Sequence, residues 1–410
     1  MKPNSAIPAP SSEHPQGLST LAPTESPRLS GRTRIKELDG LRGLAILLVL
    51  TFHLNLLQGA NSSGSLVDGW FVAVANVGWC GVDLFFVLSG FLITGILYDA
   101  KNQPGYFKNF YARRVLRIFP LYYGVLILTF WVIPNIPDSV VPAEKLDRFG
   151  RVEISQLWYW CYLSNFAIAN VGTWWHGILD VTWSLAIEEQ FYLVWPIIVL
   201  LMKRRQLMKA CAMMMAIALA TRILMTISGC NPIATYIGTP ARIDSLAAGA
   251  FVALLARSQL DLERWRPIAI QFSLASAGIL LALFLWRGGL RNMDATVQTV
   301  GLTLVSIQLA SFLVVVMTAP SQGVLSRILC NRFLVKLGTY SYAIYLFHMP
   351  LRALIRDAVY GPQQFLTLFG SRIPGQILFY LIATALTFSV ASLSWHFYEK
   401  HFLKLKRHFR

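Results

Sequence analysis

ELDGLRGLAILLVLTFHLNLL, from Glu37 to Leu57, is the stretch that decides the fold. It is apolar, long enough to cross a membrane as one helix, and carries Arg42 and His53. Because a helix turns about 100° and rises about 1.5 Å per residue, these side chains share one face, roughly 16 Å apart. Charged groups inside a bilayer normally face a bundle interior or a wet cavity. The pattern favours a site; the alternative is an arginine that reaches the headgroups and a histidine satisfied by a neighbouring helix.

Composition indicates the class of protein. Of the 410 residues, 55% are hydrophobic and only 14% are charged, whereas an ordinary soluble chain has about 25% charged residues. Apolar runs of about 20 residues recur along the whole sequence, so we expect an all-α polytopic membrane protein with about ten transmembrane helices. The expected spans cover residues 40–57, 80–98, 119–134, 184–202, 209–227, 241–256, 268–286, 297–318, 333–354 and 375–396.

The basic residues indicate an orientation in the membrane. The net charge is +16, but the Lys and Arg side chains form short clusters between apolar runs, which is the positive-inside pattern. No nucleic-acid recognition module interrupts the spans, so we expect no nucleic-acid partner. The five cysteines lack metal-ligand spacing, and no metal site is expected.

Three segments are expected along the chain. Residues 1–35 are rich in Pro, Ser and Thr and predict a disordered cytoplasmic tail. Residues 36–398 form the transmembrane domain, and residues 399–410 form a basic cytoplasmic tail. The aromatic stretch over 158–168 is too short to cross, and counting it as a span would move every later basic cluster to the other side.

Polar residues on the first two spans form two candidate clusters. On the first span, Asp39 is three residues before Arg42 and can pair with it, while His53 is a group that titrates near neutral pH. The second span carries Asp83 and, further on, the small pair Ser89 and Gly90. The small pair allows either close helix packing or contact with a ligand.

Arginines begin the third span, in YARRVLRIFPLYY over 111–123. Arg114 and Arg117 are one turn apart, with Arg113 beside them. Because guanidinium groups bind phosphates in a bidentate manner, the pattern predicts a phosphate clamp. The alternative is ordinary flanking charge of the positive-inside kind.

Two carboxylates enter the fourth span in TWSLAIEEQFYLVWP, over 182–196. Glu188 and Glu189 are adjacent, so at least one faces the bundle, where it can orient an imidazole or hold a sugar hydroxyl. Trp174 and Trp175 precede them and can stack on sugar rings or form an aromatic belt.

Later spans carry further polar groups. Arg222, Arg242 and Asp244 can pair within the fifth and sixth spans. His348 is a second histidine inside a span, and both a structural and a substrate-binding role stay open for it.

Together these stretches resemble the membrane-bound acyltransferase 3 family, whose members O-acylate cell-envelope polysaccharides, peptidoglycan and lipid-linked sugars. The resemblance covers nearly all of residues 36–400. It rests on ordered motifs: DGLR (39–42) with an Arg-x10-His pair reaching His53, GVDLFFVLSGFL (81–92), RRVLRIFP (113–120), WSLAIEEQFY (183–192) and YAIYLFHMP (342–350).

The resemblance implies a ten-span acyltransferase domain, which we expect in the bacterial cytoplasmic membrane. The positive-inside pattern predicts that both termini lie in the cytoplasm. The implied co-substrate is acyl-CoA, with acetyl-CoA the expected donor and no bound cofactor; the acceptor is a carbohydrate or lipid-linked sugar. His53 is expected to be the general base, oriented by Glu188 or Glu189. Arg42 is expected at the donor, where it guides the donor arm or stabilises the oxyanion that develops from the thioester. The expected donor site comprises Arg113, Arg114, Arg117, Ser89 and Gly90. The expected acceptor site comprises Asp83, Trp174, Trp175 and His348.

A transporter or flippase for an acyl or glycolipid species is the alternative, since it also needs charges within the bundle. The two classes differ over coenzyme A, because only the enzyme releases its free thiol. Longer members of the family carry an extracytoplasmic hydrolase-like domain that these 410 residues lack. Whether the acyl group passes to a partner therefore stays open.

Overall fold

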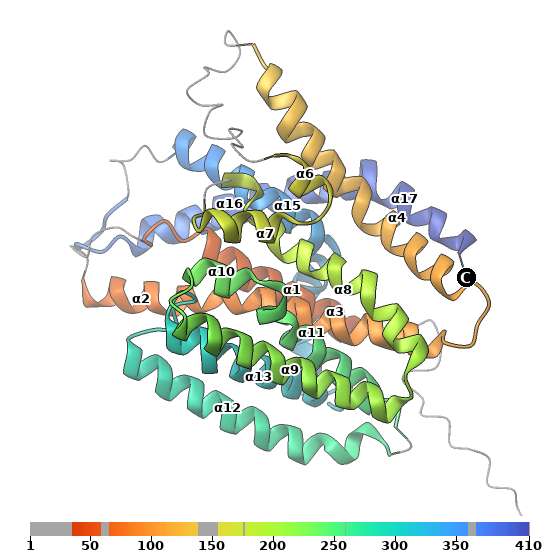
Figure 1. The fold of residues 1–410 in the computed structure, drawn as a ribbon. Helices are drawn as coiled ribbons and strands as arrows, with labels where there is room; N and C mark the ends of the chain where they lie inside the picture. The colour runs from red at the N-terminus through yellow and green to blue at the C-terminus, as the bar shows by residue number, and fades with distance from the viewer. Residues whose placement is uncertain are drawn as a thin grey trace, which may run out of the picture. The chain divides into compact units, whose positions relative to one another are not determined.

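A computed structural model describes residues 35–58, 65–137, 155–174, 177–258, 260–359 and 366–409. In these ranges the chain is helical and forms no β-strand, as predicted (Figure 1). The predicted tail over 1–35 lies outside the described residues except for Ile35. The main helices are α1 (Lys36–His53), α2 (Leu66–Asn76), α3 (Cys80–Asp99), α4 (Tyr106–Ile127), α8 (Thr182–Leu201), α9 (Arg204–Ile227), α11 (Thr239–Leu255), α12 (Arg266–Arg287), α13 (Leu302–Met317), α15 (Arg332–Val359) and α16 (Ile373–Ser394).

Within the described ranges, seven helical segments are long and apolar enough to cross a membrane, which makes the chain a multi-pass membrane protein. They are Leu66–Asp99, Tyr106–Asn135, Gly177–Leu201, Arg204–Ile227, Leu262–Arg287, Val297–Met317 and Ile373–His408. The other three predicted spans coincide with α1, α11 and α15, so the count of about ten is not confirmed. α11 has only 17 residues, and α1 and α15 carry several charged side chains.

The seam between α1 and α15 positions the site. A Cβ atom added at Gly338 would lie 1.8 Å from the Asp39 carbonyl oxygen, and one at Gly43 would lie 2.0 Å from that of Leu334. Such contacts require glycine, because they bring the two backbones together. The two helices run parallel here, so residues near their later turns also meet, and His348 lies beside His53.

The contact between α3 and α11 explains a second glycine. A Cβ atom added at Gly90 would lie 1.9 Å from the Leu246 carbonyl oxygen. Gly90 therefore serves close helix packing, which was one of its two expected roles, and its place in the donor site stays a prediction.

The arginine stretch lies within a helix rather than before one. α4 begins at Tyr106, earlier than the predicted span, because the intervening residues include good helix formers such as arginine. The C-terminal segment α17 (Lys400–Lys404) and the following turn Leu405–His408 pack on α4 (Figure 1). Arg113 Nε donates a hydrogen bond to the Phe409 carbonyl oxygen at 2.6 Å. The predicted basic tail is thus an ordered part of the bundle.

The aromatic stretch over 158–168 forms no helix of spanning length. It contributes to α6 (Leu157–Trp160) and α7 (Ser164–Val171), which have four and eight residues. The short α10 (Pro232–Ile237) packs against α7.

Candidate active site

Two histidines meet where α1 ends. His53 is the last residue of α1, and its Nδ1 atom lies 3.1 Å from Nε2 of His348 on α15. The His348 side chain is fully buried, and its Nδ1 atom lies 2.6 Å from the Tyr345 carbonyl oxygen. The pair thus joins the sequence-predicted His53 to a histidine whose role the sequence left open.

The hydrogen bonds assign the tautomers of this pair. A carbonyl oxygen only accepts hydrogen bonds, so His348 Nδ1 carries a proton and donates to it. The His348 Nε2 atom then accepts a hydrogen bond from the Nδ1–H group of His53. Neutral His53 then has its lone pair on Nε2. This arrangement orients a general base in the way that a hydrogen-bonded partner orients a catalytic imidazole.

A cavity of about 490 Å³ opens beside His53. It combines aromatic rings with polar groups, which is typical of a small-molecule or sugar site. Arg352, one turn after His348 on α15, also lines it. The other lining residues are Val49, Phe52, Gln58, Trp79, Val82, Trp174, Gly177, Asp180, Val181, Trp183, Tyr236, Asn292, Met293 and Met349.

A second polar centre lies toward the beginning of α1. Arg42 contacts Asp39 at 3.5 Å and interacts electrostatically with Arg114 and Arg117 of α4. Lys406, from the C-terminal segment, interacts with the same three arginines. We call Arg42, Arg114, Arg117 and Lys406 the cationic cluster. Such a set suits a polyanion, because like charges brought together in the free protein are relieved when phosphates bind.

Glu188 belongs to the cationic cluster's end of the bundle. Its carboxylate is hydrogen-bonded to Ser89 and Tyr192 and interacts with Arg114 and Arg42. The Ser89 and Tyr192 hydroxyls are 2.5 Å apart. The partner of His53 Nδ1 in this structure is His348 rather than a glutamate, and the orienting role expected for Glu188 or Glu189 stays a prediction. Ser89 lies where the donor site was predicted.

Glu189 lies between the same centre and a set of tyrosines. It interacts with Glu188 and Arg114. Tyr122, Tyr162 and Tyr342 each interact with its carboxylate. Like Glu188, it lies beside the arginines.

Asp83, which was predicted to bind the acceptor, forms an ion pair inside the bundle. It is fully buried and pairs with Arg242 Nη2 at 3.0 Å, while the Ser245 hydroxyl donates to it at 2.8 Å. Arg222 pairs with Asp244 at 2.8 Å, as the sequence suggested. These ion pairs join α3, α9 and α11, and Asp83 is therefore a structural residue.

Of the two tryptophans that were predicted to bind the acceptor, one lies at the His53 cavity. Trp174 lines the cavity and is 40% exposed, so its ring is available to a ligand. Trp175 lies outside the described residues. Trp183 also lines the cavity, and Arg242 lies 5.7 Å from the centre of its ring.

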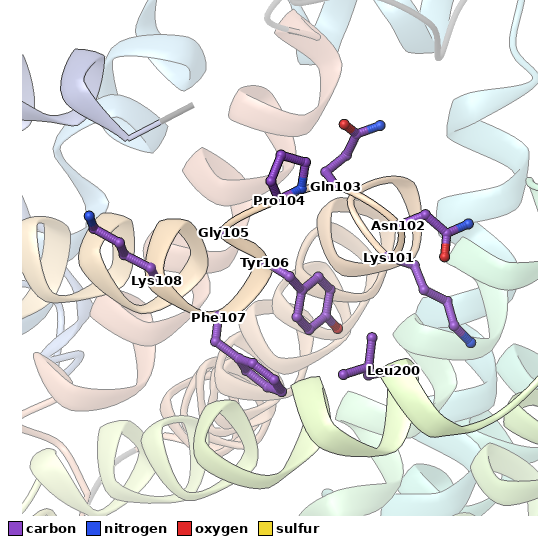
Figure 2. Close-up of a pocket in the computed structure, with 9 residues that line it drawn as sticks. All are labelled: Lys101, Asn102, Gln103, Pro104, Gly105, Tyr106, Phe107, Lys108 and Leu200. Atoms are coloured by element: carbon purple, nitrogen blue, oxygen red, sulfur yellow. The ribbon is translucent and has the colours of Figure 1, made fainter.

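A separate surface pocket of about 680 Å³ lies at the turn between α3 and α4 (Figure 2). Lys101 and Lys108 lie on opposite sides of it, with Tyr106 and Phe107 between them (Figure 2). The Lys101 ammonium donates to the Met202 carbonyl oxygen at 2.7 Å and so caps the end of α8. The pocket is distinct from the His53 cavity in its lining residues.

Comparison with known proteins decides the family. Residues 35–396 match the acyltransferase domain family (Acyl_transf_3). The chain belongs to the acyltransferase 3 family. No solved structure matches this family member.

Relatives of this acyltransferase 3 chain include bacterial O-acetyltransferases. It is 31% identical over 389 residues to the putative peptidoglycan O-acetyltransferase YrhL of Bacillus subtilis, covering 89% of this chain and 54% of YrhL. It is 28% identical over 388 residues to the peptidoglycan O-acetyltransferase OatA of Listeria monocytogenes, covering 90% and 56%. The O-acetyltransferase OatA of Staphylococcus aureus is 26% identical over 388 residues. The chain spans about half the length of these relatives.

Two residues of this acyltransferase 3 chain were missed in the sequence. Arg352 follows His348 by four residues, so the helical period alone places both on one face. Lys406 gave no comparable signal, because only the folding of the C-terminal segment onto α4 brings it to the arginines.

Proposed function

We propose that the chain is an integral-membrane O-acyltransferase that moves an acyl group, acetyl in the first instance, from acyl-CoA to a hydroxyl of a cell-wall carbohydrate. The family supports the reaction class, and the relatives named for peptidoglycan O-acetylation support the acceptor class. The observation that carries the proposal is the His53–His348 pair at a cavity, at the far end of α1 from the cationic cluster.

In this proposal His53 Nε2 removes the proton of the acceptor hydroxyl. The hydroxyl oxygen attacks the thioester carbonyl carbon, and the C–S bond breaks as the tetrahedral intermediate collapses. The proton passes from His53 to the thiolate, so the products are the ester and free coenzyme A. His348 holds the imidazole through Nδ1, so Nε2 is presented in each cycle. General base catalysis of this kind contributes about 10²–10⁴-fold.

The cationic cluster would bind the phosphates of the donor. Among the described residues, Arg114 and Arg117 have no carboxylate within ion-pair distance, and Arg114 Nε has no hydrogen-bond partner. Arg42 belongs to this centre and lies roughly 16 Å along α1 from His53. We therefore assign Arg42 to donor binding rather than to the oxyanion, which forms near His53.

Polar side chains between the two centres line the proposed path of the donor arm. Starting from the cluster, Glu188 with its partners Ser89 and Tyr192 comes first. The Ser184 and Tyr345 hydroxyls follow, 2.5 Å apart, one turn before His348. The proposed arm therefore runs from the cationic cluster past Glu188 and Tyr345 to the His53 cavity.

The proposed orientation follows from the basic residues. We place the cationic cluster toward the cytoplasm, where acyl-CoA is made, and the His53 cavity toward the outer side. In this arrangement α1, α11 and α15 would count as spans in addition to the seven, which gives ten, with both termini in the cytoplasm of a bacterium.

Thiol release tests this function. The full chain in lipid nanodiscs should release free coenzyme A when given acetyl-CoA and a peptidoglycan-derived acceptor, with one base-labile ester formed per thiol. A carrier would instead move acyl species across proteoliposomes without thiol release, and that result would overturn the proposal.

A further inference from the structure

Arg352 is a cation in the His53 cavity that the reaction as proposed does not use. Its Nε atom is buried and has no hydrogen-bond partner among the described residues, whose carboxylates form no ion pair with it. A buried guanidinium N–H without a hydrogen-bond partner is costly to keep within a bundle. The cost is recovered when an anion binds.

The position of Arg352 says which substrate would supply this anion. α1 and α15 run parallel, with Gly338 beside Asp39 and His348 beside His53. Arg352 is one turn past His348, roughly 6 Å further from the cationic cluster. The donor phosphates are assigned to that cluster, so Arg352 faces whatever enters the cavity from the opposite side.

We infer that Arg352 is an acceptor-binding residue and that the acceptor carries a negative charge, a carboxylate or a phosphate, close to the hydroxyl that is acylated. This inference rests on the proposed function, whose acceptor it narrows to anionic saccharides. Trp174, Trp183 and Tyr236 supply aromatic surface for the sugar, and Asn292 supplies an amide. A guanidinium binds carboxylates and phosphates through paired hydrogen bonds, which gives both affinity and orientation.

Calorimetric binding to the detergent-solubilised full chain tests the inference without requiring turnover. The probes are a neutral chitooligosaccharide, a muramic acid saccharide with a free carboxylate, and N-acetylglucosamine 1-phosphate. We expect at least one anionic probe to bind about tenfold or more tightly than the neutral probe. The better of the two anions identifies the source of the charge.

Variants at Arg352 make the test specific. Arg352→Gln should weaken binding of the preferred anionic probe far more than binding of the neutral probe and so abolish the preference, and Arg352→Lys should keep part of it. Lys336→Gln, an exposed change at the other end of α15, is the matched control and should keep the full preference.

Two results would overturn the inference: equal binding of charged and neutral probes by the wild type, or equal weakening of all probes by Arg352→Gln. The outcome stays separate from that of the proposed function. Acyl transfer that ignores acceptor charge contradicts only the inference, whereas charge-dependent binding without any acyl transfer contradicts only the proposed function.

Discussion

Two groups of arginines lie within the bundle, and their surroundings differ. Arg222 and Arg242 are fully buried, and each has an aspartate within 3.0 Å. Arg242 also lies over the ring of Tyr236, 4.8 Å from its centre. Arg114 and Arg117 have no carboxylate within ion-pair distance among the described residues, although Arg114 interacts electrostatically with Glu188 and Glu189 as well as with Arg117.

The difference separates structural charges from binding charges. A paired buried arginine satisfies its charge within the protein, so removing its partner destabilises the fold. An arginine that forms no direct ion pair and lies beside other arginines retains positive charge for an anionic ligand, so neutralising it should weaken binding and spare the fold. Asp83 was predicted to bind substrate because the sequence shows a buried carboxylate but not its partner.

The largest expected effect is on stability. Asp83→Asn should lower the free energy of unfolding by about 3–5 kcal/mol, because it leaves the Arg242 guanidinium buried and unpaired. Asp99→Asn on the same helix is the control: Asp99 is 56% exposed in its pair with Arg257, so its loss should cost no more than about 1 kcal/mol. Thermal unfolding in detergent measures the stability loss of both variants. Equal losses would contradict the view that the buried ion pairs of Arg222 and Arg242 hold the fold together.

The next largest effect is on donor binding. Arg114→Gln or Arg117→Gln should raise the KM for acetyl-CoA about 10–100-fold, with little loss of thermal stability. S-acetylpantetheine, which lacks the phosphates, should show no such change. An equal rise in KM for both donors would mean that the arginines do not bind phosphate.

His348 should affect turnover rather than binding. His348→Ala should lower kcat about 10–100-fold with the acceptor KM unchanged, because His53 loses the partner that orients it. His348→Gln should recover part of the rate, since an amide oxygen accepts the same hydrogen bond. Equal losses in both variants, accompanied by lower thermal stability, would assign His348 to packing alone.

The smallest effect is expected at the edge of the cationic cluster. Lys406→Gln should raise the KM for acetyl-CoA about 2–5-fold at low salt, and the difference should shrink as ionic strength increases. Steady-state kinetics at two salt concentrations measures it. Lys404→Gln, on the same C-terminal segment, is the control. An equal rise in KM for this variant would mean that the effect comes from the loss of any surface charge and not from the place of Lys406 in the cationic cluster.

Much of the fold could be predicted from the sequence, because a membrane helix is a continuous run of mostly apolar residues. The face shared by Arg42 and His53 followed from helical period alone, and the motif order gave the family. The partners of each charge were not readable, since they depend on which helices touch. Gly90 and Gly338 show why: glycine permits contact, but only the packed bundle shows with which helix.

The site shows the same limit. His348 was identified in the sequence as a histidine inside a span, whereas Arg352 was missed, and the roles of both depend on the parallel seam with α1. Glu188 and Glu189 were predicted to orient the His53 imidazole, because a carboxylate inside the bundle can accept a hydrogen bond from a histidine that acts as a base. The actual neighbours of Glu188 are Ser89, Tyr192 and the arginines.

The central claim is that His53 is the base, at a site distinct from the one that holds the donor. Acetyl transfer and acetyl-CoA binding should therefore be measured together on purified His53→Ala in nanodiscs. The account predicts that transfer falls about 10²–10⁴-fold while the Kd for acetyl-CoA stays at the wild-type value. Transfer at the wild-type rate, or loss of donor binding together with transfer, would contradict it.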